Sequence, residues 1–188
     1  MKRVVRETKE SRVEIRIARA AVAGAEIHVA TGKPFFDHML TTFARYAGLS
    51  LRLEATGDLT HHLMEDVALT LGRAVREITP PTAARYGERS IPMDDALVAA
   101  AIDVGGRAYF VGELPSKLYT HVFRSFADAL GAALHLRVLA GSDRHHILEA
   151  AFKATGLALR QAMEESGAVF STKGSIAWTI EDADEVET

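Results

Sequence analysis

The pattern His-His-x-x-Glu occurs twice in the chain, at residues 61–65 and 145–149. On a helix, the first histidine and the glutamate of each copy are about one turn apart and share a face. This spacing lets both side chains bind one metal ion, as two helical histidines do in His-Glu-x-x-His proteins. The second histidine, His62 or His146, points about 100° away because a helix turns by that angle per residue. Each of these two histidines could therefore serve a second ion.

Two upstream histidines, His38 and His121, begin matching stretches of sequence. The same residue types follow them at the same offsets: Phe43, Gly48, Leu51 and Leu53 after His38, and Phe126, Gly131, Leu134 and Leu136 after His121. The match continues through the paired motifs to Gly72, Ala74 and Arg76 in one copy and Gly156, Ala158 and Arg160 in the other. One inserted residue near Gly141 is the only gap needed. The chain is therefore predicted to be an internal duplication.

The duplication predicts a pair of metal sites. Quasi-two-fold packing would give two ions, each with ligands from both long helices, and His38 and His121 would complete each set to three nitrogens and one carboxylate oxygen. A nitrogen and oxygen set without sulfur suits manganese, iron or zinc, and ligand type alone does not choose among them. The predicted metal ligands are His38, His61, His62, Glu65, His121, His145, His146 and Glu149. The other two histidines, His28 and His135, fall on the polar phase of strands and are expected to be bystanders.

Composition excludes several classes of protein. The 188 residues include eight histidines and no cysteine, which excludes disulfide scaffolds, zinc ribbons, iron–sulfur clusters and thiol nucleophiles. A formal charge of −3 gives no strong field for nucleic acid. No apolar run approaches the roughly 20 residues of a membrane helix, and the N-terminal residues 1–10 lack the apolar core of a signal peptide. We expect a soluble, cytoplasmic protein with no nucleic-acid or membrane partner.

Periodicity predicts the elements that must position these side chains. In the first half, alternation predicts strands between residues 3 and 31, with a hairpin near Gly24, and a further strand from Leu49. Helical spacing predicts helices over 36–47, ended by Gly48, and 61–78, ended by Pro80. In the second half, strands are predicted over 91–94, 96–104, 108–114 and 134–138, and helices over 121–133 and 145–165.

These elements predict an α+β fold made of duplicated half-domains. Residues 1–84 form the first half and residues 85–188 the second, and together they make one compact catalytic unit. Each half is a small mixed β-sheet with two helices on one face. Because either half alone would bury too little surface, we expect the two halves to pack helix face to helix face.

Five motifs, spread over nearly the whole chain, carry a specific resemblance. They are Gly32-Lys-Pro-Phe-Phe-Asp37-His38, Gly57-Asp58 followed by His61-His62-x-x-Glu65-Asp66, Asp103-x-Gly105-Gly106-Arg107, His145-His146-x-x-Glu149 and Ser171-Thr172-Lys173-Gly174. In these motifs the chain resembles imidazoleglycerol-phosphate dehydratases. The resemblance implies a hydro-lyase of histidine biosynthesis that converts imidazoleglycerol phosphate to imidazoleacetol phosphate. It also implies two Mn²⁺ ions per active site, and a homo-oligomeric 24-subunit shell of trimers with active sites shared between neighbouring subunits.

The resemblance also implies roles for residues outside the paired motifs. Glu10 matches a residue that contacts substrate or moves protons, and Asp94 would contact the substrate hydroxyls or orient a ligand. The phosphate set would be Arg85, Arg107, Ser171 and Lys173, with Lys153 one helical turn beyond Glu149. Where the family often has a glutamine that contacts substrate, this chain has Thr42.

The expected chemistry is a dehydration assisted by the metal ions. Ions on the ring nitrogens would stabilise an imidazolate, which would expel the C3 hydroxyl to give a diazafulvene. Loss of the C2 proton would then give an enol that becomes the ketone. Such proton transfers need a carboxylate near the metal. The candidates are Glu149, Glu65 and Glu10, and Glu149 is favoured.

Two other classes of function would also explain paired metal motifs. A dinuclear metal-dependent phosphohydrolase would use a bridging hydroxide on the same ions and would release inorganic phosphate. A non-catalytic metal-binding shell protein would bind the ions without turnover. Ultraviolet detection of the ketone formed from imidazoleglycerol phosphate, with and without manganese, distinguishes the three hypotheses.

Overall fold

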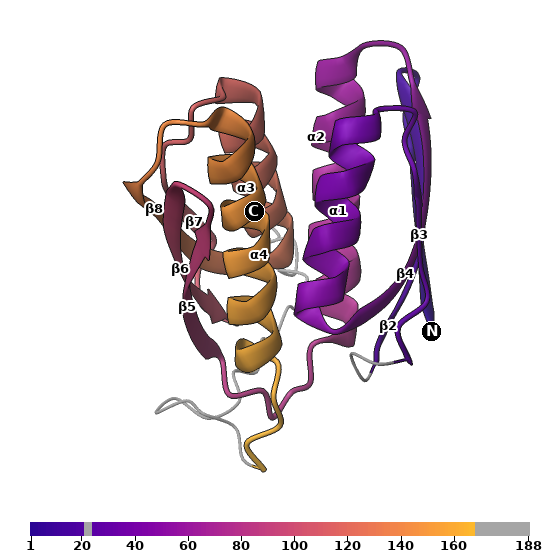
Figure 1. The fold of residues 1–188 in the computed structure, drawn as a ribbon. Coiled ribbons are helices and arrows are strands. Elements are labelled where there is room, and N and C mark those ends of the chain that lie inside the picture. Colours follow the sequence, from indigo (N-terminus) through magenta and orange to yellow (C-terminus); the bar gives the residue numbers. More distant parts are fainter. Residues whose placement is uncertain (21–23, 168–188) are drawn as a thin grey trace, which may run out of the picture.

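Two four-stranded sheets form the outer layers of the structure, and two pairs of helices fill the space between them (Figure 1). The computed structural model describes residues 1–20 and 24–167. The apolar core lies between each sheet and its helices and continues between the helix pairs. Within the described residues, no helix is both long enough and apolar enough to cross a membrane.

The first half contributes one sheet and its two helices. The elements, in chain order, are β1 (Lys2–Glu7), β2 (Ser11–Arg19), β3 (Ile27–Ala30), α1 (Pro34–Ala47), β4 (Leu49–Gly57) and α2 (Thr60–Ile78). The strand order is β1-β2-β4-β3, antiparallel except for the parallel pair of β3 and β4. Val13, Ile15 and Ile17 are fully buried, as their alternation along β2 predicts. Apolar alternation therefore gives this sheet one face toward the helices.

The second half repeats this arrangement. Its elements are β5 (Tyr86–Met93), β6 (Ala96–Val104), β7 (Tyr109–Val111), α3 (Lys117–Leu130), β8 (Ala132–Ala140) and α4 (Arg144–Ala162). The order β5-β6-β8-β7 and the parallel pair of β7 and β8 reproduce the first sheet. The α+β fold of duplicated halves, each a mixed sheet with two helices on one face, is confirmed.

The predicted hairpin near Gly24 is wrong. β2 and β3 are not neighbours, because β4 lies between them and pairs with β3 in parallel. Parallel neighbours need a crossover rather than a tight turn, and α1 supplies it. The hairpin of this half lies instead between β1 and β2.

Several predicted boundaries also move. The predicted helix 121–133 ends at Leu130, because Gly131 has a φ of 74° and terminates it in the left-handed conformation. The predicted helix 145–165 ends at Ala162, and the predicted strand 108–114 shortens to Tyr109–Val111.

The crossovers give all four helices the same direction. Since β3 and β4 run parallel and each is followed by a helix, α1 and α2 begin at the same end of their sheet. The same holds for α3 and α4 in the second half. The four helix N-termini gather at the upper end of the molecule in Figure 1. This end therefore receives the six histidines of the repeat.

Two glycines let the halves approach backbone to backbone. A Cβ built at Gly72 of α2 would lie 2.9 Å from the amide nitrogen of Leu130 in α3, and closer still to the carbonyl oxygen of Phe126. A Cβ at Gly156 of α4 would lie 2.8 Å from the carbonyl oxygen of Phe43 in α1. Both glycines, like the two phenylalanines, occupy equivalent positions of the repeat. The register between the halves is therefore fixed at two matching points.

We predict that Gly72→Ala and Gly156→Ala each destabilise the protein by about 1 to 3 kcal/mol, because the added methyl group meets backbone atoms that cannot move aside. This loss would outweigh the gain of about 1 kcal/mol that alanine brings to a helix interior. Urea unfolding measures the change. Gly24→Ala is the control, since a Cβ there meets nothing within 4 Å. Variants at 72 and 156 as stable as the control would contradict the close contact.

Candidate metal centre

The starts of the helices place the histidines. Asp143 caps α4 by accepting hydrogen bonds from the backbone N–H groups of His145, at 2.7 Å, and His146, at 3.2 Å. Ser116 caps α3 in the same way through Tyr119, and α1 begins at Pro34, a residue suited to a first helical turn. The six histidines of the repeat therefore lie within the first two turns of their helices.

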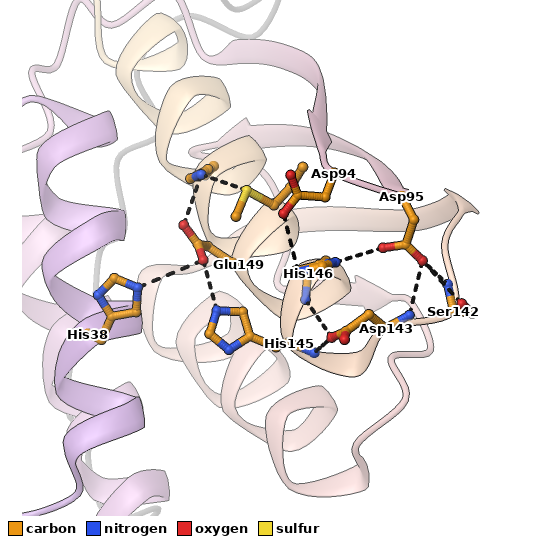
Figure 2. Close-up of polar contacts among 10 residues, drawn as sticks. His38, Asp94, Asp95, Ser142, Asp143, His145, His146 and Glu149 are labelled. Atoms are coloured by element: carbon orange, nitrogen blue, oxygen red, sulfur yellow. Dashed lines mark hydrogen bonds and ion pairs between the residues drawn. The ribbon is translucent and has the colours of Figure 1, made fainter.

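The first cluster joins α1 to α4. The His145 Nε2 atom lies 3.1 Å from the Glu149 Oε2 atom, and the His38 Nε2 atom lies 3.8 Å from the same oxygen. Figure 2 shows both imidazole rings directed at this carboxylate. One ligand atom from each of the three residues lies within 4.8 Å of the others. The cluster therefore converges across the boundary between the two halves.

The second cluster is its counterpart between α2 and α3. The Glu65 Oε2 atom lies 3.6 Å from His61 Nε2 and 3.3 Å from His121 Nε2. The two imidazole rings stack, with centroids 5.0 Å apart and planes 18° apart. Their ligand atoms meet the same 4.8 Å criterion. The repeat therefore produces two clusters of the same composition, each with two imidazole nitrogens and one carboxylate.

Each cluster differs from the prediction in two respects, the number of its nitrogen ligands and the helices that supply them. Each has two imidazole nitrogens where three were predicted. We expected ligands from both long helices around each ion, but each cluster in this chain combines one long helix with the short helix of the other half. The reason is the packing, in which α4 lies against α1 and α2 lies against α3. Each His-Glu pair on a long helix therefore faces a short helix.

His62 and His146 turn away from these clusters, as helical geometry predicts. His62 Nδ1 lies 3.2 Å from an Asp58 oxygen and 3.4 Å from a Glu10 oxygen. His146 lies between two carboxylates, with Nδ1 at 2.8 Å from Asp95 and Nε2 at 3.2 Å from Asp94 (Figure 2). A carboxylate on Nδ1 orients an imidazole ring and makes Nε2 a better metal ligand.

Glu10, Asp58 and His62 themselves form a third close group, and all three meet the 4.8 Å criterion. Its two carboxylates are exposed, and it contains a single imidazole. Each of the other two clusters has two imidazoles and one carboxylate that is buried or half-buried. Sequence reasoning missed Asp58 and Asp95 as partners of His62 and His146. The four-residue spacing from Asp58 to His62 was the available signal for the first.

The two clusters differ in charge. Burial alone would raise the pKa of Glu149, but the hydrogen bond from Lys153, at 2.9 Å, and the nearby His145 bring the pKa below its ordinary value. Glu149 is therefore ionised at neutral pH. Glu65 occupies the matching position, but among the described residues its ion pairs are with His61 and His121 alone. The residue that corresponds to Lys153 in the repeat is Leu69.

The carboxylates of Asp95, beside His146, and Asp58, beside His62, also have shifted pKa values. Asp95 accepts hydrogen bonds from the backbone N–H of Ser142, the His146 ring and the backbone N–H of Asp143, which lower its pKa. The hydrogen bond to Asp95 in turn raises the pKa of His146. The Asp58 pKa is lowered first by the backbone N–H of Leu59.

His121 shows that the residues fit a metal ion. Its Nε2 atom is buried and has no hydrogen-bond partner among residues 1–20 and 24–167, although the Glu65 oxygen is only 3.3 Å away. A buried, unpaired polar atom is costly unless another group binds it. Two imidazole nitrogens and a carboxylate oxygen, with no sulfur, suit Mn²⁺, Fe²⁺ or Zn²⁺.

The remaining predicted residues divide into two groups. Lys153 and Asp94 lie beside the first cluster and His146, respectively. Arg85, with a φ of 72°, pairs with Asp103 at 3.1 Å, and Arg107 follows β6. Asp94 lies just before β6 and Asp103 lies near the other end of this strand. At a rise of about 3.3 Å per residue, the Arg85–Asp103 pair is therefore roughly 30 Å of extended strand away from Asp94.

Other predictions have simpler outcomes. Ser171 and Lys173 lie outside the described residues. Thr42 is buried in α1, at 8% exposure. His28 and His135 are exposed on their strands, as predicted for bystanders.

Known proteins resemble the chain over most of its length. A family model described as imidazoleglycerol-phosphate dehydratase matches residues 31–159. A Bacillus cereus (strain B4264) protein with this name is 40% identical over 190 residues, which cover 92% of this chain and 97% of that protein. The bifunctional histidine biosynthesis protein HisB of Stenotrophomonas maltophilia (strain K279a) is 44% identical over 191 residues. This match covers 92% of the chain, which spans about half (52%) of that longer relative.

Solved structures agree with the sequence matches. The crystal structure of IGPD from Pyrococcus furiosus has a TM-score of 0.81 and 40% identity, with 92% of this chain and 99% of that chain covered. The imidazoleglycerol-phosphate dehydratase of Staphylococcus aureus N315 has a TM-score of 0.73 and 30% identity, with 88% and 100% covered. The paired clusters therefore lie in a chain that belongs to the imidazoleglycerol-phosphate dehydratase family.

Proposed function

We propose that this protein dehydrates imidazoleglycerol phosphate to imidazoleacetol phosphate, a step of histidine biosynthesis. The observation that carries the proposal is the pair of equivalent histidine–carboxylate clusters in a chain of this family. A lone metal motif would suit many functions, whereas two clusters related by the repeat match a substrate whose ring has two nitrogens. A cytoplasmic location stays a prediction.

We propose two divalent ions per active site, Mn²⁺ being the expected metal. His38, His145 and Glu149 would hold one ion, and His61, Glu65 and His121 the other. Bound ions supply Lewis acidity that stabilises negative charge developing on the substrate ring. The chain's own contribution is to hold three ligand atoms in place at each cluster before any ion arrives.

The geometry separates the roles of the carboxylates. Glu149 directs Oε2 at two imidazoles and Oε1 at Lys153, so both oxygens are engaged. Its lowered pKa also makes it a weak base. We therefore propose that Glu149, and Glu65 by equivalence, act as ligands rather than as the acid–base group favoured from the sequence. Glu10 is exposed beside His62 and outside both clusters, so we propose it as the proton carrier.

We also propose that neighbouring copies of the chain complete each site. His62 and His146 are oriented by carboxylates but turned away from the clusters of their own chain. Arg85 pairs with Asp103, near the end of β6 that lies opposite Asp94 and His146. A second copy that supplies the histidine and the phosphate-binding arginines resolves both observations. The trimers and the 24-subunit shell stay predictions.

The outer faces of the two sheets support assembly. On the first sheet this face carries ion pairs such as Arg3–Glu14 and Arg52–Glu54, which is typical of a solvated surface. On the second sheet Tyr86, Tyr109 and Val111 are 52%, 63% and 42% exposed. Tyr86 lies on β5 and the other two on β7, the two edge strands of this sheet. Large exposed apolar side chains are a feature of interfaces. We therefore propose that the second sheet faces a neighbouring copy.

We predict that the protein binds two Mn²⁺ ions per chain and that His121→Ala binds one fewer, because the variant removes one of three ligands from a single cluster. Metal analysis after dialysis measures the stoichiometry. His28→Ala is the control, since this histidine is exposed on β3, away from the clusters. Two tightly bound ions in His121→Ala would contradict the assignment.

We predict that Glu10→Gln keeps both ions but lowers kcat by about 10² to 10⁴, the usual contribution of general acid–base catalysis. Glu149→Gln should instead lose the ion of the first cluster. Ultraviolet detection of the ketone, together with metal analysis, distinguishes the two variants. If Glu10→Gln turns over at the wild-type rate while Glu149→Gln is inactive with both ions bound, the roles are reversed.

We predict that Arg107→Ala raises KM about 10- to 100-fold with a smaller effect on kcat, since a hydrogen bond to a charged group contributes about 1.5 to 3 kcal/mol. Steady-state kinetics with imidazoleglycerol phosphate measures this. Arg73→Ala is the matched control, because Arg73 pairs with Glu77 on the exposed face of α2. An unaltered KM would mean that another residue holds the phosphate.

A further inference from the structure

Asp66 is a buried carboxylate that neither cluster uses. It follows Glu65 on α2 and is 7% exposed. Its two oxygens have separate partners, since Arg6 Nε donates to Oδ1 at 2.7 Å and the Ser11 hydroxyl donates to Oδ2. Both partners come from the β1–β2 hairpin. The carboxylate therefore ties the helix that carries His61, His62 and Glu65 to this hairpin.

The packing of the fold does not by itself require this carboxylate. The equivalent position in the second half is Ala150, which is fully buried against the second sheet. A buried charge is costly unless it is paired, and an alanine serves the same packing position without that cost. Asp66 therefore has a role that its counterpart lacks.

The hydrogen bonds of the hairpin turn indicate what this role is. The Thr8 hydroxyl accepts from the backbone N–H groups of Glu10, at 3.1 Å, and Ser11, at 3.0 Å. The Glu10 carbonyl accepts from the Asp58 backbone N–H at 3.0 Å. Asp66 anchors the same turn through the Ser11 side chain. The turn is therefore held internally by Thr8 and externally by two residues near the start of α2.

The second half holds its equivalent turn by another route. Asp95, in the β5–β6 turn, accepts from the backbone N–H of Ser142 at 2.7 Å and of Asp143 at 3.1 Å, just before α4. It also contacts His146 at 2.8 Å. In both halves, a strand turn that carries an acidic residue is fastened to the start of the long helix. Both halves fix this turn to the long helix, although they use different residues to do so. This indicates that the position of the turn is important for the function of the site.

We propose that Asp66 and Ser11 are positioning residues that hold the Glu10 carboxylate beside His62, where its oxygen lies 3.4 Å from the ring nitrogen. The inference rests on the proposed function, in which Glu10 carries the proton. Ser11 links the turn to Asp66, and Asp66 lies on the same helix as the metal ligands. The position of Glu10 relative to the metal ligands on α2 is therefore fixed through Ser11 and Asp66.

A double-mutant cycle tests the proposal. The variants are Ser11→Ala, Glu10→Gln and the pair together, with kcat, KM, bound Mn²⁺ and thermal stability measured for each. Ser11→Ala should lower kcat about 10- to 100-fold, as expected for a displaced catalytic group, with both ions retained. In the Glu10→Gln background it should cause no further loss, because there is no longer a carboxylate to position. Ser11→Thr, which restores the hydroxyl, should recover most of the activity.

Val13→Ala is the matched control, since Val13 is a fully buried neighbour on the same strand without a link to Asp66. It should lower stability while kcat stays unchanged. A Ser11→Ala effect of the same size with and without Glu10, or no effect at all, would overturn the proposal. So would full activity in Glu10→Gln. If Ser11→Ala fails to fold, Thr8→Val loosens the same turn from an exposed position and should give the same non-additive result.

Hydrogen exchange separates this inference from the proposed function. Ser11→Ala should speed amide exchange at residues 8–11 while residues 60–65 keep wild-type protection, whether or not the protein turns over substrate. If Ser11→Ala speeds exchange at residues 8–11 but the wild-type protein forms no ketone, the link between Ser11 and the turn is supported and the proposed dehydratase activity is contradicted. Unchanged exchange at residues 8–11 would overturn the link itself.

Discussion

The close contact between helices of opposite halves is the constraint on which both clusters depend. Gly72 brings α2 onto the backbone of α3, and Gly156 brings α4 onto α1. Neither of these two clusters lies within one half, because each combines a His-Glu pair from one half with a histidine from the other. If the helices stood further apart or slid along each other, His38 would separate from Glu149. Packing, rather than a flexible loop, therefore sets the ligand geometry.

The duplication makes the two clusters alike in donors but not in charge. The ammonium group of Lys153 partly balances the negative charge of the Glu149 carboxylate, whereas the matching position beside Glu65 is the uncharged Leu69. The turn that carries Glu10 is likewise fastened through a buried Asp66 that the second half lacks. A duplicated scaffold can thus supply two similar ion sites. The neighbouring residues that differ between the two copies then give each site a different electrostatic environment.

Sequence patterns predicted what depends on local spacing. The four-residue spacing of His61 and Glu65, the matched offsets after His38 and His121, and the glycine helix ends all follow from helix geometry. Pairings over long distances did not follow. Nothing local distinguishes a hairpin near Gly24 from a parallel crossover, and the choice of α1 rather than α2 as the partner of α4 depends on packing across the whole molecule. The roles that the resemblance implies for Arg85 and Arg107 stay predictions.

The most direct test of the account is an anomalous diffraction map at the manganese absorption edge, from crystals of the protein loaded with Mn²⁺. The account predicts two peaks per chain, one between α1 and α4 beside His38, His145 and Glu149, and one between α2 and α3 beside His61 and His121. Each peak should also lie near His62 or His146 from a neighbouring copy. A single peak, or a peak at the Glu10–Asp58 group with none at the two clusters, would contradict it.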